Sequence, residues 1–162
     1  MLFRSPVDGR LLQLNSYENR VFQVGLDDGG LVVAKFYRPG RWSDAQIHEE
    51  HAFAHDLASA EVPAVPPLPL VLPDHARRPE LAARLSGPQA TLGHVGAHRV
   101  AISPRKGGRG PELEDPDVLR WIGRFLARLH QVGDRQRFAH RRTLNVAQHG
   151  RAARDSLSRS PW

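Results

Sequence analysis

The sequence of 162 residues contains no cysteine, and this absence excludes several kinds of chemistry at once. Without cysteine the chain has no disulfide, no thiolate nucleophile and no cysteine-ligated zinc site. Long hydrophobic runs are also missing, since no segment approaches the roughly 18 to 20 apolar residues of a bilayer crossing. Residues 1–10 lack the apolar stretch of a signal peptide. We therefore expect a cytoplasmic protein with no membrane partner.

The composition is that of a globular protein. Hydrophobic residues make up 40% of the chain and charged residues 25%, values close to the average for folded domains. The length suits one domain, or a small domain with a piece of another. The 13 prolines and 14 glycines are expected to interrupt the core.

Lysine is scarce, and most of the positive charge is carried by arginine. The net charge is +6, but only Lys35 and Lys106 are lysines. Residues 133–162 hold seven arginines against two aspartates, so the excess lies near the end of the chain. This basic segment could grip nucleic-acid phosphates, but Phe138 and Trp162 are its only candidates for stacking on bases. Binding to nucleic acid is therefore the weaker alternative, and a solvated, unpartnered segment is expected.

Hydrophobic patterning predicts a mostly antiparallel sheet. The polar stretch 15–19 is interpreted as a tight connection, and Asp-Asp-Gly-Gly at 27–30 as a hairpin turn. The proline-rich stretch 61–79 allows at most one edge strand, and residues 74–88 resemble a surface insertion. The predicted strands are residues 11–14, 20–26, 31–37, 91–92 and 99–102.

Two helices are predicted from their capping residues. Ser43 and Gln46 fit a capping box that opens a helix over 44–58. Asp115 and Pro116 open a second helix that Gly133 closes, after a linker over 103–110. An apolar stripe at helical spacing runs along the second helix: Val118, Ile122, Phe125 and Leu129.

Glu50 falls inside the apolar stripe of the first helix, beside Ile47 and Leu57. A carboxylate facing a core costs several kcal/mol unless a cation meets it, so this position needs a partner. Lys35, in the middle of a β-branched strand, is the natural candidate. The alternative is an edge-strand lysine that reaches water. Glu49 is predicted to face water.

Three histidines lie on one flank of the first helix. His48, His51 and His55 are close enough in this pattern to share a metal, although a solvated histidine edge is the commoner arrangement. We therefore predict no metal site in this chain.

Several segments together resemble one family. Taken together they are similar to bacterial Ser/Thr protein kinases of the aminoglycoside-phosphotransferase-like branch of the kinase fold. The resemblance covers most of residues 7–150 and is weakest over 72–99. The matching segments are 14–21, 32–39, Arg41-Trp42, Glu49-Glu50-His51, Glu61-Val62-Pro63, Gly107-Gly108-Arg109, Gly123, Leu129-His130-Gln131 and 138–143.

The resemblance implies an ATP site. Lys35 would hold the α- and β-phosphates and Glu50 would orient it. The adenine would stack against a strand and hinge over 100–104, including Ile102 and Ser103, with backbone groups reading the base edge. The loop over the phosphates would consist of Ser16, Tyr17, Glu18, Asn19 and Arg20.

The sequence also departs from the family pattern. Members carry a His-Gly-Asp run with the catalytic base and a metal ligand, and later an Asp-x-Asp pair for Mg²⁺. Here His149-Gly150 is followed by Arg151, and no Asp-x-Asp pair follows. Phosphoryl transfer depends on these groups, so we expect a truncated kinase that is inactive by itself and has no catalytic residue of its own. A non-catalytic nucleotide-sensing module is the second alternative.

These inferences combine into an α+β architecture. Residues 7–104 are expected to form a kinase-like amino-terminal lobe, 105–133 the hinge linker and first helix of a second lobe, and 134–162 a basic, incomplete remainder. The expected partners are ATP and, in the intact kinase, Mg²⁺ and a protein substrate. The apolar stripe of helix 116–132 is expected to be exposed, and to favour self-association, unless it folds back on the sheet.

Overall fold

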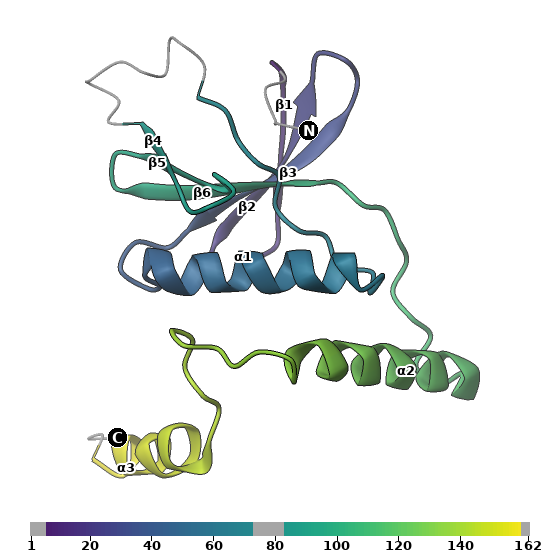
Figure 1. The fold of residues 1–162 in the computed structure, drawn as a ribbon, viewed down its shortest axis with the longest axis vertical. Coiled ribbons are helices and arrows are strands. Elements are labelled where there is room, and N and C mark those ends of the chain that lie inside the picture. Colours follow the sequence, from purple (N-terminus) through teal and green to yellow (C-terminus); the bar gives the residue numbers. More distant parts are fainter. Residues whose placement is uncertain (1–5, 73–82, 160–162) are drawn as a thin grey trace.

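The computed structural model describes residues 6–72 and 83–159. Its centre is a six-stranded antiparallel sheet in the order β1-β2-β3-β6-β5-β4, with one helix lying across it (Figure 1). This is the expected α+β architecture. The strands are β1 Val7–Leu14, β2 Arg20–Leu26, β3 Leu31–Tyr37, β4 Arg84–Ser86, β5 Leu92–Val95 and β6 His98–Pro104. The helices are α1 Asp44–Ser59, α2 Pro116–Gly133, the π-helical turn η3 Val146–Arg151 and α3 Ala152–Leu157.

Strand β3 lies inside the sheet, between β2 and β6. Lys35 pairs with Val21 on one side and with Ala101 on the other. The alternative of an edge-strand lysine is therefore wrong. The β2–β3 hairpin turns through Gly29, whose φ of +83° is a conformation that favours glycine.

The sheet has one strand more than the sequence predicts. Residues 84–86, predicted as part of a surface insertion, form the edge strand β4 on β5. Residues 74–82 of that insertion lie outside the described part of the chain. In the described portion of the proline-rich stretch, Leu70 donates its amide to the Ala90 carbonyl at 3.0 Å, outside any strand of the sheet.

Helix α1 packs on the sheet through a small buried core. Ile47 and Leu92 are fully buried, and Tyr37 and Ala101 complete the cluster. Ser43 accepts the Gln46 amide hydrogen at 3.2 Å and donates its own amide to the Gln46 side chain at 2.9 Å, which confirms the capping box. The start and the rotation of α1 are therefore set by a local signal and by one buried face.

Ion pairs also hold the first turn of α1 to the sheet. Asp44 accepts a hydrogen bond from Arg99 on β6 and lies 3.3 Å from His94 on β5. These contacts tie α1 to the part of the sheet farthest from β1.

Helix α2 packs against the C-terminal end of α1. Asp115 caps it and Pro116 is its first residue, as predicted, but Gly133 remains helical and Asp134 follows in a right-handed conformation. Val132 joins Leu57 and Val62 in a second core cluster. The predicted stripe is thus partly covered by α1, and not by the sheet.

One flank of α2 beside this stripe is open, since Leu119 and Leu126 are 50% and 51% exposed. Trp121, on the other side of the stripe, is 56% exposed. Among the described residues, no helix is both long enough and apolar enough to cross a bilayer.

Removing the side chain of Ile47 should destabilise the lobe strongly. The Ile47→Ala variant is expected to lose about 3 kcal/mol of unfolding free energy, because it leaves a cavity at a fully buried position. Urea denaturation followed by circular dichroism measures this loss. Leu144→Ala, at a residue 82% exposed, is the matched control and should change little. Equal losses in the two variants would contradict the assignment of the core.

The open flank of α2 should bind a hydrophobic dye and promote self-association. We expect the Leu119→Glu/Leu126→Glu variant to reduce both, because it places charge on this flank. Dye fluorescence and light scattering measure the two effects. A wild-type chain that is monomeric and binds no dye would refute this prediction.

Candidate functional site

The structure brings Lys35 and Glu50 together. Lys35 lies in β3 and Glu50 near the middle of α1, and Lys35 Nζ is 2.8 Å from Glu50 Oε1. Both side chains are about one-third exposed. Arg141 is a second cation at this point, with Nη1 at 2.9 Å from Glu50 Oε2. Each carboxylate oxygen of Glu50 therefore has a cation of its own.

The two cations keep Glu50 ionised. Burial by itself raises the pKa of this carboxyl, but the hydrogen bond from Lys35 and the charges of Lys35 and Arg141 outweigh burial, so the pKa lies below its ordinary value. The site thus presents a fixed negative charge that orients an ammonium group.

Glu49 does not simply face water, and that prediction was wrong. Its carboxylate accepts backbone N–H hydrogen bonds from Ala139, from His140 at 3.0 Å and from Arg141 at 2.7 Å. Gln46 Nε2 donates to the His140 carbonyl oxygen at 2.9 Å. Burial raises the pKa of Glu49, but the hydrogen bonds from these amide groups lower it by more. The pKa of Glu49 therefore lies below its ordinary value. The outer face of α1 therefore holds the segment 139–141, which we call the clamp segment.

Sequence reasoning missed this contact for a physical reason. Backbone amides carry no residue-type signature, so no pattern in the sequence marks 139–141 as partners of Glu49. The basic segment was expected to be solvated and unpartnered, yet its first part is bound to α1. Farther along, Arg154 pairs with the adjacent Asp155 at 2.7 Å. Fewer arginines are therefore free for nucleic-acid phosphates than the composition implies.

A chain of contacts joins Glu50 to the loop 15–19. The Arg141 guanidinium lies over the Trp42 ring, 4.4 Å from its centroid, and that of Arg41 lies over the same ring at 5.3 Å. Arg41 Nη2 in turn bonds Glu18 Oε1 at 2.8 Å. Neither Arg141 nor Trp42 was singled out as a site residue from the sequence.

The loop 15–19 is held by its own polar side chains. Ser16 Oγ accepts the Asn19 amide hydrogen at 3.3 Å, and Asn19 Oδ1 accepts that of Arg38 at 3.3 Å. Tyr17 is fully exposed. Ser16 and Asn19, expected to bond phosphates, thus have partners within the protein.

A cavity of about 1100 Å³ is lined by Ser16, Tyr17, Glu18, Asn19 and Arg20 together with Phe22 and Phe36. Lys35 is not one of its lining residues. Adjacent strand residues alternate between faces, so Phe36 leaves the sheet on the side opposite to Lys35. The loop and the Lys35–Glu50 pair therefore do not line this cavity together.

The predicted hinge residues belong to strand β6. Ile102 pairs with Ala34 and Ser103 with Val33. The Ile102 carbonyl oxygen accepts a hydrogen bond from the Leu68 amide at 2.7 Å, so this backbone group already has a partner within the protein.

A buried polar chain lies behind Glu50, between α1 and the sheet. His51 Nε2 and the Tyr37 hydroxyl are 2.9 Å apart, and His51 Nδ1 and Thr91 Oγ1 are 2.8 Å apart. Burial lowers the pKa of His51 to about 4. Burial and the charge of Glu50 raise the pKa of Tyr37. His51 is therefore neutral at pH 7.

These contacts also bear on the three helix histidines. Both ring nitrogens of His51 have partners, and His48 Nε2 lies 3.2 Å from Ser86 Oγ. Within residues 6–72 and 83–159 no group of three or more histidine or carboxylate side chains is arranged to hold a metal.

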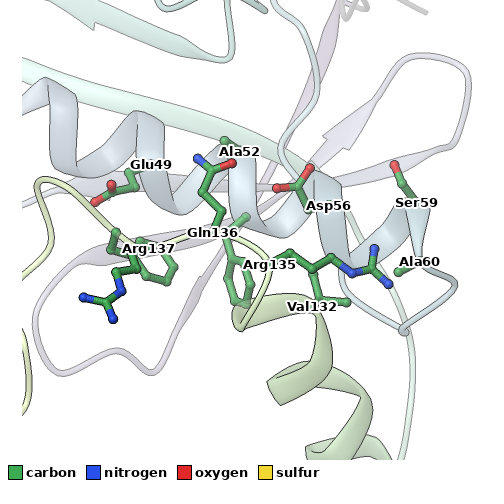
Figure 2. Close-up of a pocket in the computed structure, with 11 residues that line it drawn as sticks. Glu49, Ala52, Asp56, Ser59, Ala60, Val132, Arg135, Gln136 and Arg137 are labelled. Carbon is green, nitrogen blue, oxygen red and sulfur yellow. The ribbon is translucent and has the colours of Figure 1, made fainter.

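A second cavity, of about 400 Å³, lies between α1 and residues 132–138. Figure 2 shows Glu49 and Asp56 on the helix, with Gln136 reaching toward it from the opposite wall. The rings of Phe53 and Phe138 make an edge contact beside it, with centroids 5.2 Å apart. This aromatic contact adds to the polar contacts that hold the clamp segment on α1.

Comparison with known proteins gives concordant results. A model of the phosphotransferase enzyme family (APH) matches residues 10–160. Stress response kinase A of Salmonella choleraesuis (strain SC-B67) is 42% identical over 143 residues, and that of Escherichia coli (strain K12) is 41% identical over 140. The matches cover 88% and 86% of this chain, but the chain spans only 38% of the length of each relative.

A solved structure has a similar fold. Amicoumacin kinase hAmiN, in complex with AMP-PNP, Ca²⁺ and Ami, superposes with a TM-score of 0.62 and 16% sequence identity. The superposition covers 99% of this chain and 52% of that kinase. At this identity the likeness concerns the fold alone.

The buried His51 should make stability depend on pH. Its pKa of about 4 lies below the ordinary 6.5, so the unfolded chain binds more protons between these values. The free energy of unfolding should be retained above pH 6.5 and fall toward pH 4, by on the order of 3 kcal/mol. Urea unfolding at a series of pH values measures this dependence.

Two variants isolate the contribution of His51. His51→Gln should make the unfolding free energy depend less on pH. The dependence that remains is attributed to His48 and His94, because burial also lowers their pKa values. His98→Gln, at an exposed position, should retain the full slope. An unchanged slope in His51→Gln would show that another group is responsible.

Proposed function

Because the chain belongs to the phosphotransferase enzyme family, we propose that residues 7–104 form the nucleotide-binding lobe of a Ser/Thr protein kinase of the stress response kinase A type. The observation that carries this proposal is the Lys35–Glu50 pair, with its 2.8 Å contact between an interior strand and a helix. A compact ammonium held by a carboxylate is suited to bind nucleotide phosphates.

The proposed roles follow from this pair. Lys35 binds the α- and β-phosphates of ATP, and Glu50 limits the positions that the ammonium can adopt. The loop from Ser16 to Arg20 covers the phosphates. For this role Ser16 and Asn19 exchange their present backbone partners for phosphate oxygens, or the loop supplies its backbone amides instead. Ile102 and Ser103 border the adenine.

For this chain we propose binding of ATP without phosphoryl transfer. The 162 residues contain no His-Gly-Asp run. In the described part of the chain, no group of three or more histidine, aspartate or glutamate side chains is placed to hold a metal ion. In the family, Mg²⁺ neutralises charge on the phosphates. The residues of this chain contribute the ammonium, its carboxylate and the loop.

The two lysines of the chain allow a matched test of nucleotide binding. A fluorescent ATP analogue should bind the wild-type chain, and Lys35→Met should weaken binding by about tenfold or more, because it removes the phosphate-binding charge. Lys106→Met removes the same charge at an exposed position and should leave affinity unchanged. Circular dichroism verifies that each variant is folded.

Equal affinities of the two methionine variants would refute a phosphate role for Lys35. A folded wild-type chain that binds no nucleotide would refute the proposed function of the chain itself. Lys35→Arg should not restore binding, because a planar guanidinium does not replace a compact ammonium at this position.

A further inference from the structure

We propose that Arg141 is a positioning residue, which holds the Glu50 carboxylate in the orientation that Lys35 requires. This inference goes beyond the proposed function, and its consequence for nucleotide affinity rests on that function. Arg141 lies 91 positions from Glu50 in the sequence, in the clamp segment and not in the lobe that carries the pair.

The geometry at Glu50 divides the carboxylate between two cations. Lys35 Nζ donates a hydrogen bond to Oε1 at 2.8 Å, and Arg141 Nη1 donates one to Oε2 at 2.9 Å. With one bond on each oxygen, the carboxylate cannot rotate without breaking a charge-assisted hydrogen bond. Removal of Arg141 would leave a single contact, about which Glu50 can turn.

Arg141 is itself held from several directions. Its backbone amide donates to Glu49 at 2.7 Å, and the preceding carbonyl accepts from Gln46 at 2.9 Å. Its guanidinium lies over the Trp42 ring at 4.4 Å. These partners belong to α1 or immediately precede it, so the helix that carries Glu50 also holds the arginine that orients it.

The same arrangement extends to the loop 15–19. Arg41 lies over the Trp42 ring and bonds Glu18, and this hydrogen bond lowers the pKa of Glu18. A displacement of Trp42 would therefore disturb contacts to the loop and to Glu50 together.

The pKa of Glu50 provides a direct readout of Arg141. The charged or titratable groups that act on Glu50 are Lys35 and Tyr37 on β3, His51 on α1 and Arg141 on the clamp segment. In Arg141→Gln the Glu50 pKa should rise, because one of the two cations is lost. Carbon-13 NMR titration of the Glu50 carboxyl measures it in the full chain. Arg142→Gln, the exposed neighbour with the same charge, should leave it unchanged.

Nucleotide affinity provides a second readout. At pH 7, Arg141→Gln should bind the fluorescent ATP analogue about fivefold more weakly than wild type, and Arg142→Gln should bind it equally well. As the pH is lowered, Arg141→Gln should lose nucleotide binding at a higher pH than wild type does, because Glu50 becomes protonated at a higher pH in the variant. Arg141→Lys should restore part of the affinity, since it returns the charge without the planar contact to Trp42.

The outcomes separate the two proposals. An unchanged Glu50 pKa in a folded Arg141→Gln variant would overturn the role of Arg141, whether or not the chain binds ATP. If wild type binds no nucleotide but the Glu50 pKa still rises, the proposed function fails and the positioning of Glu50 stands. If Arg141→Gln does not fold, Trp42→Leu serves as the second variant. It keeps the Arg141 guanidinium but removes the ring on which that group lies, so it should also raise the Glu50 pKa. No rise in Trp42→Leu would then overturn the role.

Discussion

The half-buried carboxylate of Glu50 is the group on which the rest of the site depends. A negative charge at the contact between helix and sheet is costly unless cations meet it. Lys35 meets it from the sheet and Arg141 from beyond α2, so three segments distant in sequence converge on two oxygen atoms. The capping box and the buried Ile47 set the start and the rotation of α1, and so place Glu50 where both cations reach it.

Two adjacent glutamates on one helix perform different tasks. Glu50 faces the sheet and binds side-chain cations, whereas Glu49 faces outward and binds three successive backbone amides. Helix α1 is therefore held on both sides, by the sheet and by the clamp segment. In this fold the helix that orients the lysine acts as a connector between the sheet and the chain that follows α2.

The geometry joins Lys35 to Glu50 but leaves other parts of the proposed ATP site apart. The chain spans 38% of the length of its curated relatives, and it carries the segment in which they match. Among the described contacts, the polar loop is connected to the pair through Arg41, Trp42 and Arg141, and Lys35 does not line the cavity beside the loop. For the loop to contact a nucleotide bound at Lys35, Ser16 and Asn19 would therefore have to break their present hydrogen bonds within the protein.

The sequence by itself determined the local features, because their causes lie within a few residues. Examples are the capping box at Ser43, the hairpin at Gly29 and the requirement that Glu50 find a cation. The tertiary structure alone decided which second cation meets Glu50, what Glu49 binds and that residues 84–86 form an edge strand. These depend on contacts across as many as 92 positions and on backbone amides that every residue type carries, so neither spacing nor residue type could reveal them.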